Sequence, residues 1–231
     1  MTSRRRMLAG DNLTSKGVVN GVIQDSWETI IKTIHKGKAQ KYYSVGNWKT
    51  LDMGSEGQIR MELIGFDKDT RSDGTGKAPT TWAGIELLKT KVQWTNTSYG
   101  SSYSGTNYRD CYLRHYYHTV VKPMMPDVVK NNLVTVSKRS SSMSGAVTTN
   151  EEVWTTTINE SGHINEAGLY YPVYAYGNDR VKKCCYGSTT KVEWWLRDVQ
   201  NNGEAQAFSK QGADTDVSFS TKLGVPLFFC L

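Results

Sequence analysis

The chain has 231 residues and a formal net charge of +6; this length suits one large domain or two small ones and can bury a core without disulfides. Its mean hydropathy of −0.53, and the lack of an apolar run near the roughly 20 residues that cross a bilayer, exclude membrane insertion. Seven Trp and thirteen Tyr residues are too many for a disordered chain.

The basic residues are concentrated at one place only. Arg4, Arg5 and Arg6 form a run, whereas the other Lys and Arg residues are scattered among acids. Because no nucleic-acid motif or basic stripe interleaved with aromatics is present, we expect no specific nucleic-acid binding. The apolar stretch after the run stops at Gly10, short of the roughly 7 residues that a signal peptide needs at least. We therefore expect no signal peptide.

The four cysteines make no recognisable framework in a chain of this length. Cys184 and Cys185 are adjacent, too close in sequence for ordinary disulfide geometry with each other. Neither they nor Cys111 and Cys230 have the CxxC spacing of a zinc site. We expect free thiols, no metal site and no cofactor, in a protein assembled in a reducing cytoplasm.

A polar arm and a helix are expected first. Residues 1–24 are polar, contain glycine and lack periodicity, which is typical of an N-terminal arm. Asp25 or Ser26 can cap the helix that follows. Its apolar side chains repeat at helical spacing: Trp27, Ile30, Ile31 and Ile34.

A strand and a glycine-rich loop follow. Residues 58–63 alternate strictly between apolar and polar, which predicts a half-buried strand. The loop at residues 67–76 resembles a calcium-binding loop. However, Arg71 and Ser72 stand where an oxygen ligand and the turn glycine are needed, and Ala78 replaces the closing glutamate. We expect a hairpin turn without a metal.

The middle of the chain mixes helices and loops. Apolar spacing over residues 108–121 predicts a second helix, ended by Pro123. Residues 127–132 predict a short helix, with Pro126 in its first turn. The β-branched residues 133–136 predict a strand, and the low-complexity residues 140–149 predict a loop.

The C-terminal third is strand-like. It begins at Val153 and Trp154, and its strongest segment is residues 191–197, which alternate between two faces. Residues 198–216 are polar, and we expect the apolar residues 224–231 to form a core strand. Without a linker or a repeat, residues 25–231 are assigned to a single domain.

Five stretches, taken in order, resemble a family of phage and prophage proteins of Gram-positive bacteria with an uncharacterised domain. The stretches are DSWETII at 25–31, IGFD at 64–67 with DGTGK at 73–77, TW at 81–82 with ELL at 86–88, WWLR at 194–197 and GVPLFFCL at 224–231. Asp198 and Pro226 stand where the family usually has small residues. These departures affect local loops rather than the fold.

The domain of this family resembles the superfamily of C-type lectins and formylglycine-generating enzymes. The resemblance implies an α+β fold, in which a small, loop-rich mixed sheet is flanked by two helices and the last strand lies near the first. Lectin-type relatives place their ligand surface on loops between late strands, which here correspond to residues 198–216. Phage variable proteins of the superfamily diversify a comparable surface.

The resemblance implies a non-enzymatic virion structural protein: a capsid decoration, a head fibre or a tail-associated protein, assembled in the host cytoplasm. The basic arm, with Arg4, Arg5 and Arg6, would attach the domain to other virion proteins. Because phage surface proteins are often symmetric oligomers, we expect a homo-oligomer.

An alternative function is recognition of a host receptor, most simply a surface glycan. Sugar sites join an aromatic face to planar polar groups, although strand tryptophans more often pack in cores and polar loop residues are often ordinary surface. The candidate ligand-binding residues are Tyr186, Trp195, Asp198, Gln200, Asn201, Asn202, Glu204 and Gln206.

An enzyme is the third interpretation, and we do not favour it. His115 and His118 are spaced i, i+3 on the expected helix, close enough to share a metal, yet the sequence offers no obvious carboxylate or third ligand. The oxidase branch of the superfamily uses a cysteine pair, which the adjacent Cys184 and Cys185 do not match in spacing. We expect no catalytic residues.

Overall fold

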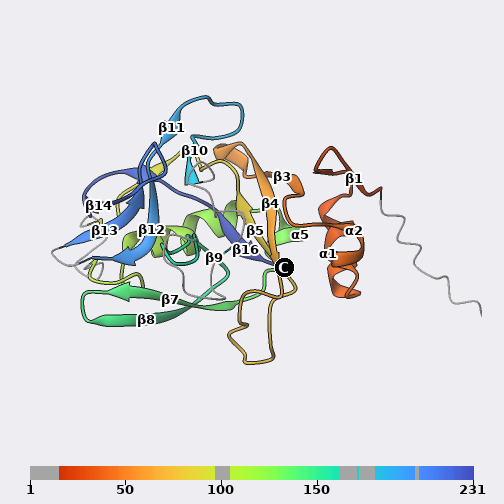
Figure 1. Ribbon diagram of the computed structural model, residues 1–231, viewed down its shortest axis with the longest axis horizontal. Coiled ribbons are helices and arrows are strands. Elements are labelled where there is room, and N and C mark those ends of the chain that lie inside the picture. The colour runs from red at the N-terminus through yellow and green to blue at the C-terminus, as the bar shows by residue number, and fades with distance from the viewer. Residues whose placement is uncertain (1–15, 97–104, 162–170, 172–179, 201–202) are drawn as a thin grey trace, which may run out of the picture.

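The computed structural model describes residues 16–96, 105–161, 171, 180–200 and 203–231. These form a mixed α+β domain, mostly strands in two main mixed sheets with few short helices (Figure 1). The expected α+β class is confirmed. Where one small sheet was expected, there are two, of seven and five strands. No helix in the described ranges is long and apolar enough to cross a membrane.

The seven-stranded sheet contains, in spatial order, β1 (Val18–Val19), β2 (Val22–Ile23), β3 (Trp48–Asp52), β4 (Gln58–Phe66), β5 (Thr80–Gly84), β16 (Phe228–Cys230) and β9 (Val153–Trp154). The five-stranded sheet contains β14 (Asp214–Ser218), β13 (Glu204–Phe208), β12 (Trp194–Val199), β15 (Leu223–Gly224) and β6 (Lys91–Val92). Two further hairpins pair β7 (Val136–Ser142) with β8 (Gly145–Glu151) and β10 (Lys182–Lys183) with β11 (Lys191–Val192).

The helices are short. They are α1 (Trp27–His35), α2 (Ala39–Tyr42), the 3-10 turn η1 (Gly54–Glu56), α3 (Tyr112–Tyr116), the π-helical turn η3 (Tyr117–Val121), α4 (Lys122–Met124) and α5 (Asp127–Lys130). Figure 1 places α1 and α2 at the end of the molecule near β1 and β3, away from β12–β14.

The expected first helix is confirmed as α1. The side chain of Ser26 caps it by accepting a hydrogen bond from the Thr29 amide at 3.3 Å. The predicted apolar stripe is buried. Its first member, Trp27, packs edge-on against Trp82 of β5, with ring centroids 5.1 Å apart, so the stripe covers the seven-stranded sheet.

The described part of the expected arm is bound to this sheet. Strands β1 and β2 form a hairpin, and Val22 pairs with Trp48 of β3. Ile23 is 1% exposed in the core. The arm predicted over residues 1–24 therefore does not include residues 18–23, whose two short apolar pairs, Val18–Val19 and Val22–Ile23, were too short to indicate strands. Residues 1–15, with Arg4, Arg5 and Arg6, lie outside the described residues.

The strand expected at residues 58–63 and the hairpin turn after it are both confirmed. Strand β4 covers residues 58–66, and Thr70 pairs with Lys77 across the turn. The Asp73 carboxylate accepts the Thr75 amide at 3.0 Å, and hydrogen bonding by Arg71 and Thr75 lowers its pKa. This carboxylate is therefore used within the turn.

The second helix begins later and runs further than expected. Its cap is Cys111, whose Sγ accepts the Arg114 amide at 3.3 Å. The α-helical turns change to a π-helical turn at residues 117–121, and Pro123 lies in the first turn of α4 instead of ending the helix. Pro123 lies just after the π-helical turn and one residue before the end of the helical stretch at Met124, so only the final turn lacks its N–H. The short helix α5 is confirmed, and Pro126 is its N-cap residue instead of lying in its first turn.

The prediction of a loop at residues 140–149 is wrong. The prediction of a strand at 133–136 is also wrong except for Val136, where β7 begins. Both regions contribute to the β7–β8 hairpin, which runs in register from Val136 opposite Glu151 to Ser142 opposite Gly145. Serine and threonine suggested a loop by composition. However, Lys138 and Ser140 are buried and Arg139 is exposed, so the hairpin has the alternation of a strand.

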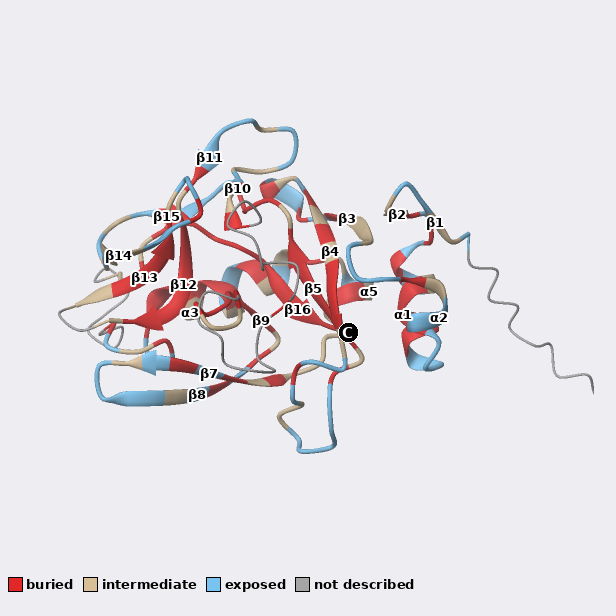
Figure 2. Cartoon of the chain, viewed as in Figure 1, coloured by how far each residue is buried: buried red, intermediate tan, exposed pale blue. Residues whose placement is uncertain are grey.

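The C-terminal strands are confirmed, with two corrections. Trp194 packs on Phe208 (ring centroids 5.0 Å apart), whereas Trp195 packs on Trp94 (5.7 Å) on the other face of β12. The polar segment 198–216 is not a loop, because β13 and β14 occupy much of it. Strand β16 lies buried between β5 and β9, and four strands separate it from β1, so the last strand is not beside the first (Figure 2).

Candidate functional site

A cavity of about 580 Å³ opens where four segments meet. One wall is the turn after β4, with Lys68 and Lys77, and another is strand β7, residues 137–142. Residues 157–160, which follow β9, and the end of β12 with part of β13 complete it. The cavity thus lies at the junction of both main sheets and the β7–β8 hairpin.

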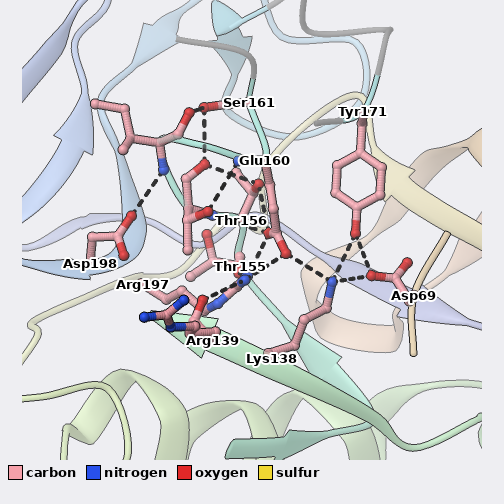
Figure 3. A network of polar contacts seen from close by, with 12 residues as sticks. Asp69, Lys138, Arg139, Thr155, Thr156, Glu160, Ser161, Tyr171, Arg197 and Asp198 are labelled. Carbon is pink, nitrogen blue, oxygen red and sulfur yellow. Dashed lines mark hydrogen bonds and ion pairs between the residues drawn. The ribbon is translucent and has the colours of Figure 1, made fainter. Parts of the chain in front are cut away.

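A buried ion pair network forms the floor of this junction (Figure 3). Lys138 of β7 is 2% exposed. Its Nζ donates to the carboxylate of Asp69, to Glu160 Oε1 at 3.0 Å and to the Tyr171 hydroxyl at 2.8 Å. The Tyr171 hydroxyl in turn donates to Asp69 Oδ1 at 2.8 Å. One lysine therefore joins three segments that are distant in sequence.

Arg197 of β12 extends the network on the other side of Glu160. Its Nη2 and Nη1 donate to the two oxygens of Glu160 at 2.6 and 2.7 Å. Burial alone would raise the pKa of Glu160, but Arg197 and Lys138 lower it to about 2. Lys138 likewise lowers the pKa of Asp69 in spite of its burial. Both carboxylates are therefore ionised at neutral pH and compensated by two cations.

Asp198 fastens β12 to the other walls. One carboxylate oxygen accepts the Ser141 amide at 2.9 Å, and the other accepts the Ile158 amide at 3.0 Å. Burial raises the pKa of Asp198, and these two amides together with Arg197 offset the effect only in part. Its role in the geometry is to hold β7 and the 157–160 segment at a fixed distance from β12.

Ser140 is a buried residue of the cavity wall. This residue of β7 is 3% exposed and lines the cavity. Its hydroxyl is inaccessible and has no hydrogen-bond partner within the described chain. A buried hydroxyl without a partner costs about 1–3 kcal/mol, so this position reduces the stability of the fold.

Three of the sequence-predicted residues meet at the cavity. Asp198, Gln200 and Gln206 all line it, although not on an exposed loop as expected. Asp198 and Gln206 are buried, at 4% and 6% exposure, and they belong to β12 and β13. The predicted segment therefore does contribute to the cavity, but through buried side chains and not through an exposed surface.

The other predicted residues do not meet there. Trp195 is fully buried and donates its indole N–H to the Val92 carbonyl at 2.8 Å, so it is a packing residue. Tyr186 is 50% exposed beside Arg60, and Glu204 lies half-buried in β13 outside the cavity lining. Asn201 and Asn202 fall outside the described residues.

Sequence reasoning missed the network and Ser140. Asp69 was assigned only to a turn, and Lys138, Glu160 and Ser140 belonged to no motif. One signal was available: Val136, Lys138 and Ser140 are spaced two apart and so share one face of a strand. A lysine between two inward positions needs a buried acidic partner.

One of the two helix histidines, His118, has a carboxylate partner that the sequence did not indicate. His118 Nε2 lies 2.8 Å from Glu151 Oε2, and Arg114 Nε donates to Glu151 Oε1 at 2.6 Å. Although burial would raise the pKa of Glu151, these two partners lower it. Among the residues that the structure describes, no three His, Cys, Asp or Glu side chains are grouped to hold a metal.

Comparisons of the chain with family models, with curated proteins and with solved structures gave no match. The cavity and the sequence motifs therefore carry the functional proposal.

Proposed function

We propose that this chain is a non-enzymatic phage virion protein that binds a carbohydrate of the host surface in the cavity between β7, β12 and the turn after β4. The single observation that carries the binding role is the cavity itself, whose polar lining is held in place before any ligand arrives. Preorganised side chains lose little further entropy on binding, which favours affinity.

The size and chemistry of the cavity suit a sugar. Its volume of about 580 Å³ falls within the 300–1,000 Å³ typical of small-ligand sites. Serines and threonines line much of it, and Gln200 and Gln206 add planar amides. Sugar hydroxyls both donate and accept, as such a lining requires.

The ionisation of the carboxylates favours binding over catalysis. A general acid needs a pKa near the working pH, whereas the pKa of Glu160 is lowered to about 2 and that of Asp69 is also lowered. The one cavity carboxylate with a raised pKa, Asp198, has an amide bound to each oxygen. These groups are suited to fixing a site rather than to moving protons.

The virion setting rests on the ordered motifs. They support a C-type-lectin-like domain in a capsid decoration, head fibre or tail-associated protein. Residues 1–15, with Arg4, Arg5 and Arg6, would attach it to other virion proteins, and repeated copies in a homo-oligomer would raise avidity for the host surface.

Binding can be tested on a glycan array and on host cells with the full chain. The double variant Gln200→Ala/Gln206→Ala should lose binding by about tenfold or more, since each lost hydrogen bond costs about 0.5–1.5 kcal/mol. Gln211→Ala is the matched control, because Gln211 is exposed in the β13–β14 turn and outside the cavity lining. An array on which the folded wild-type chain binds no carbohydrate would contradict the proposal.

A further inference from the structure

We infer that the ligand of this cavity is an anionic carbohydrate, a sugar that carries a carboxylate, sulfate or phosphate group. The inference rests on the proposed function and adds the charge of the ligand to it. It comes from comparing the basic residues that form ion pairs with acids of the protein with the basic residues of the lining that form none.

The compensated groups lie in the floor. Lys138 and Arg197 are matched there by Asp69 and Glu160, through the hydrogen bonds described above. These two cations and two anions sum to no net charge. The floor therefore neither attracts nor repels a charged ligand strongly, and its role is to hold the walls.

Three further basic residues line the cavity: Lys68 and Lys77 from the turn after β4, and Arg139 from β7. Lys77 Nζ donates to the Thr70 hydroxyl at 2.7 Å, a neutral partner. Within the described chain, Lys68 and Arg139 form no ion pair. The only acid of the described lining outside the floor is Asp198, which binds the amides of Ser141 and Ile158.

The lining of the cavity therefore has a surplus of positive charge outside its floor. A neutral sugar would leave that surplus uncompensated, and a cationic ligand would be repelled. An oxyanion would be attracted by these basic residues, and charge-assisted hydrogen bonds are roughly twice as strong as neutral ones. A bare ion would leave most of the cavity and its serine, threonine and glutamine lining unused, so the anion is expected on a larger, hydroxylated molecule.

The test uses an array of matched pairs: oligogalacturonides and their methyl esters, sulfated and desulfated chondroitin oligosaccharides, and mannose 6-phosphate with mannose. We expect the full chain to bind the acidic member of at least one pair about tenfold more tightly than its neutral partner. Preference for a single pair identifies the oxyanion. Inorganic phosphate at millimolar concentration should not displace the bound sugar; displacement would mean that a free anion suffices and would overturn the carbohydrate part.

Two double variants separate the cavity from general surface charge. Lys68→Gln/Arg139→Gln should abolish the acidic preference and leave binding of the neutral member within about threefold. Lys36→Gln/Lys210→Gln removes the same charge from exposed residues outside the lining and should leave the preference intact. Equal loss in both variants, or equal binding of acidic and neutral members by the wild type, would overturn the inference while the proposed function stands. No binding to any glycan would overturn both.

Discussion

Glu160 and Arg197 form a two-pronged ion pair, with N–O distances of 2.6 and 2.7 Å, between the segment after β9 and strand β12. The Arg197 side chain is 1% exposed and that of Glu160 is 12% exposed. Because neither charge can be hydrated well, each depends on the other. Removing either charge should therefore lower the free energy of unfolding strongly.

Glu160→Gln should destabilise the fold by about 3–5 kcal/mol at pH 7, because it leaves Arg197 and Lys138 short of one buried counter-charge. The variant should also respond less to acid. The folded-state pKa of about 2 lies below the ordinary 4.5, so the wild-type carboxylate contributes stability above pH 4.5 that is lost as the pH falls toward 2. Urea unfolding at pH 7 and pH 3 measures both effects. Glu193→Gln, at a half-buried glutamate of the same region, is the control, and an equal acid response in Glu160→Gln and wild type would contradict the assignment.

Lys182 gives a second rise of stability with pH, in an alkaline window. Burial lowers its pKa to about 8 from 10.5, and its Nζ donates to the Gly84 carbonyl. Between these values the unfolded chain binds more protons, so the stability of the wild type should rise with pH relative to Lys182→Met, by about 2 kcal/mol from pH 7 to pH 9.5. Denaturation of both proteins at the two pH values checks this. A constant difference would show that Lys182 titrates normally.

Ser140→Ala should cost little stability. Removing a buried hydroxyl without a described partner should leave the melting temperature unchanged or slightly raised, since no hydrogen bond is lost. Calorimetric melting supplies the measurement. A marked fall in melting temperature would mean that the hydroxyl is bonded inside the protein.

Deletion of residues 2–15 should leave the melting temperature of the domain within a few degrees of wild type and abolish incorporation into particles. Deletion of residues 2–24 should also destabilise the fold, because it removes the hairpin on β3 and the buried Ile23; losing such a core side chain costs roughly 2–5 kcal/mol. Melting curves and particle composition distinguish the two deletions. Normal incorporation of the shorter deletion would exclude the arm as the attachment segment.

The elements that the sequence predicted well have strong local patterns. Trp27 and the isoleucines after it repeat at helical spacing, and Ser26 is a good cap, so α1 depends little on the rest of the chain. The hairpin of β7 and β8 was missed because its inward residues are Lys138 and Ser140, whose burial depends on Asp69 and Glu160 far away in sequence. Local patterns do not encode such partners. For the same reason Asp198 and Gln206 were found as residues but placed on the wrong surface.

Strand β16 has a consequence for how the chain folds. Thr80 Oγ1 donates to the Leu231 carbonyl across 151 residues of sequence, and β16 separates β5 from β9 within one sheet. Pairing over such a span is slow, because most of the chain must be ordered before the contact can form. Until residues 228–230 emerge from the ribosome, β5 and β9 each have an open edge that can pair with another nascent chain. Slow synthesis or a premature stop near the end should therefore give insoluble aggregates rather than a folded fragment.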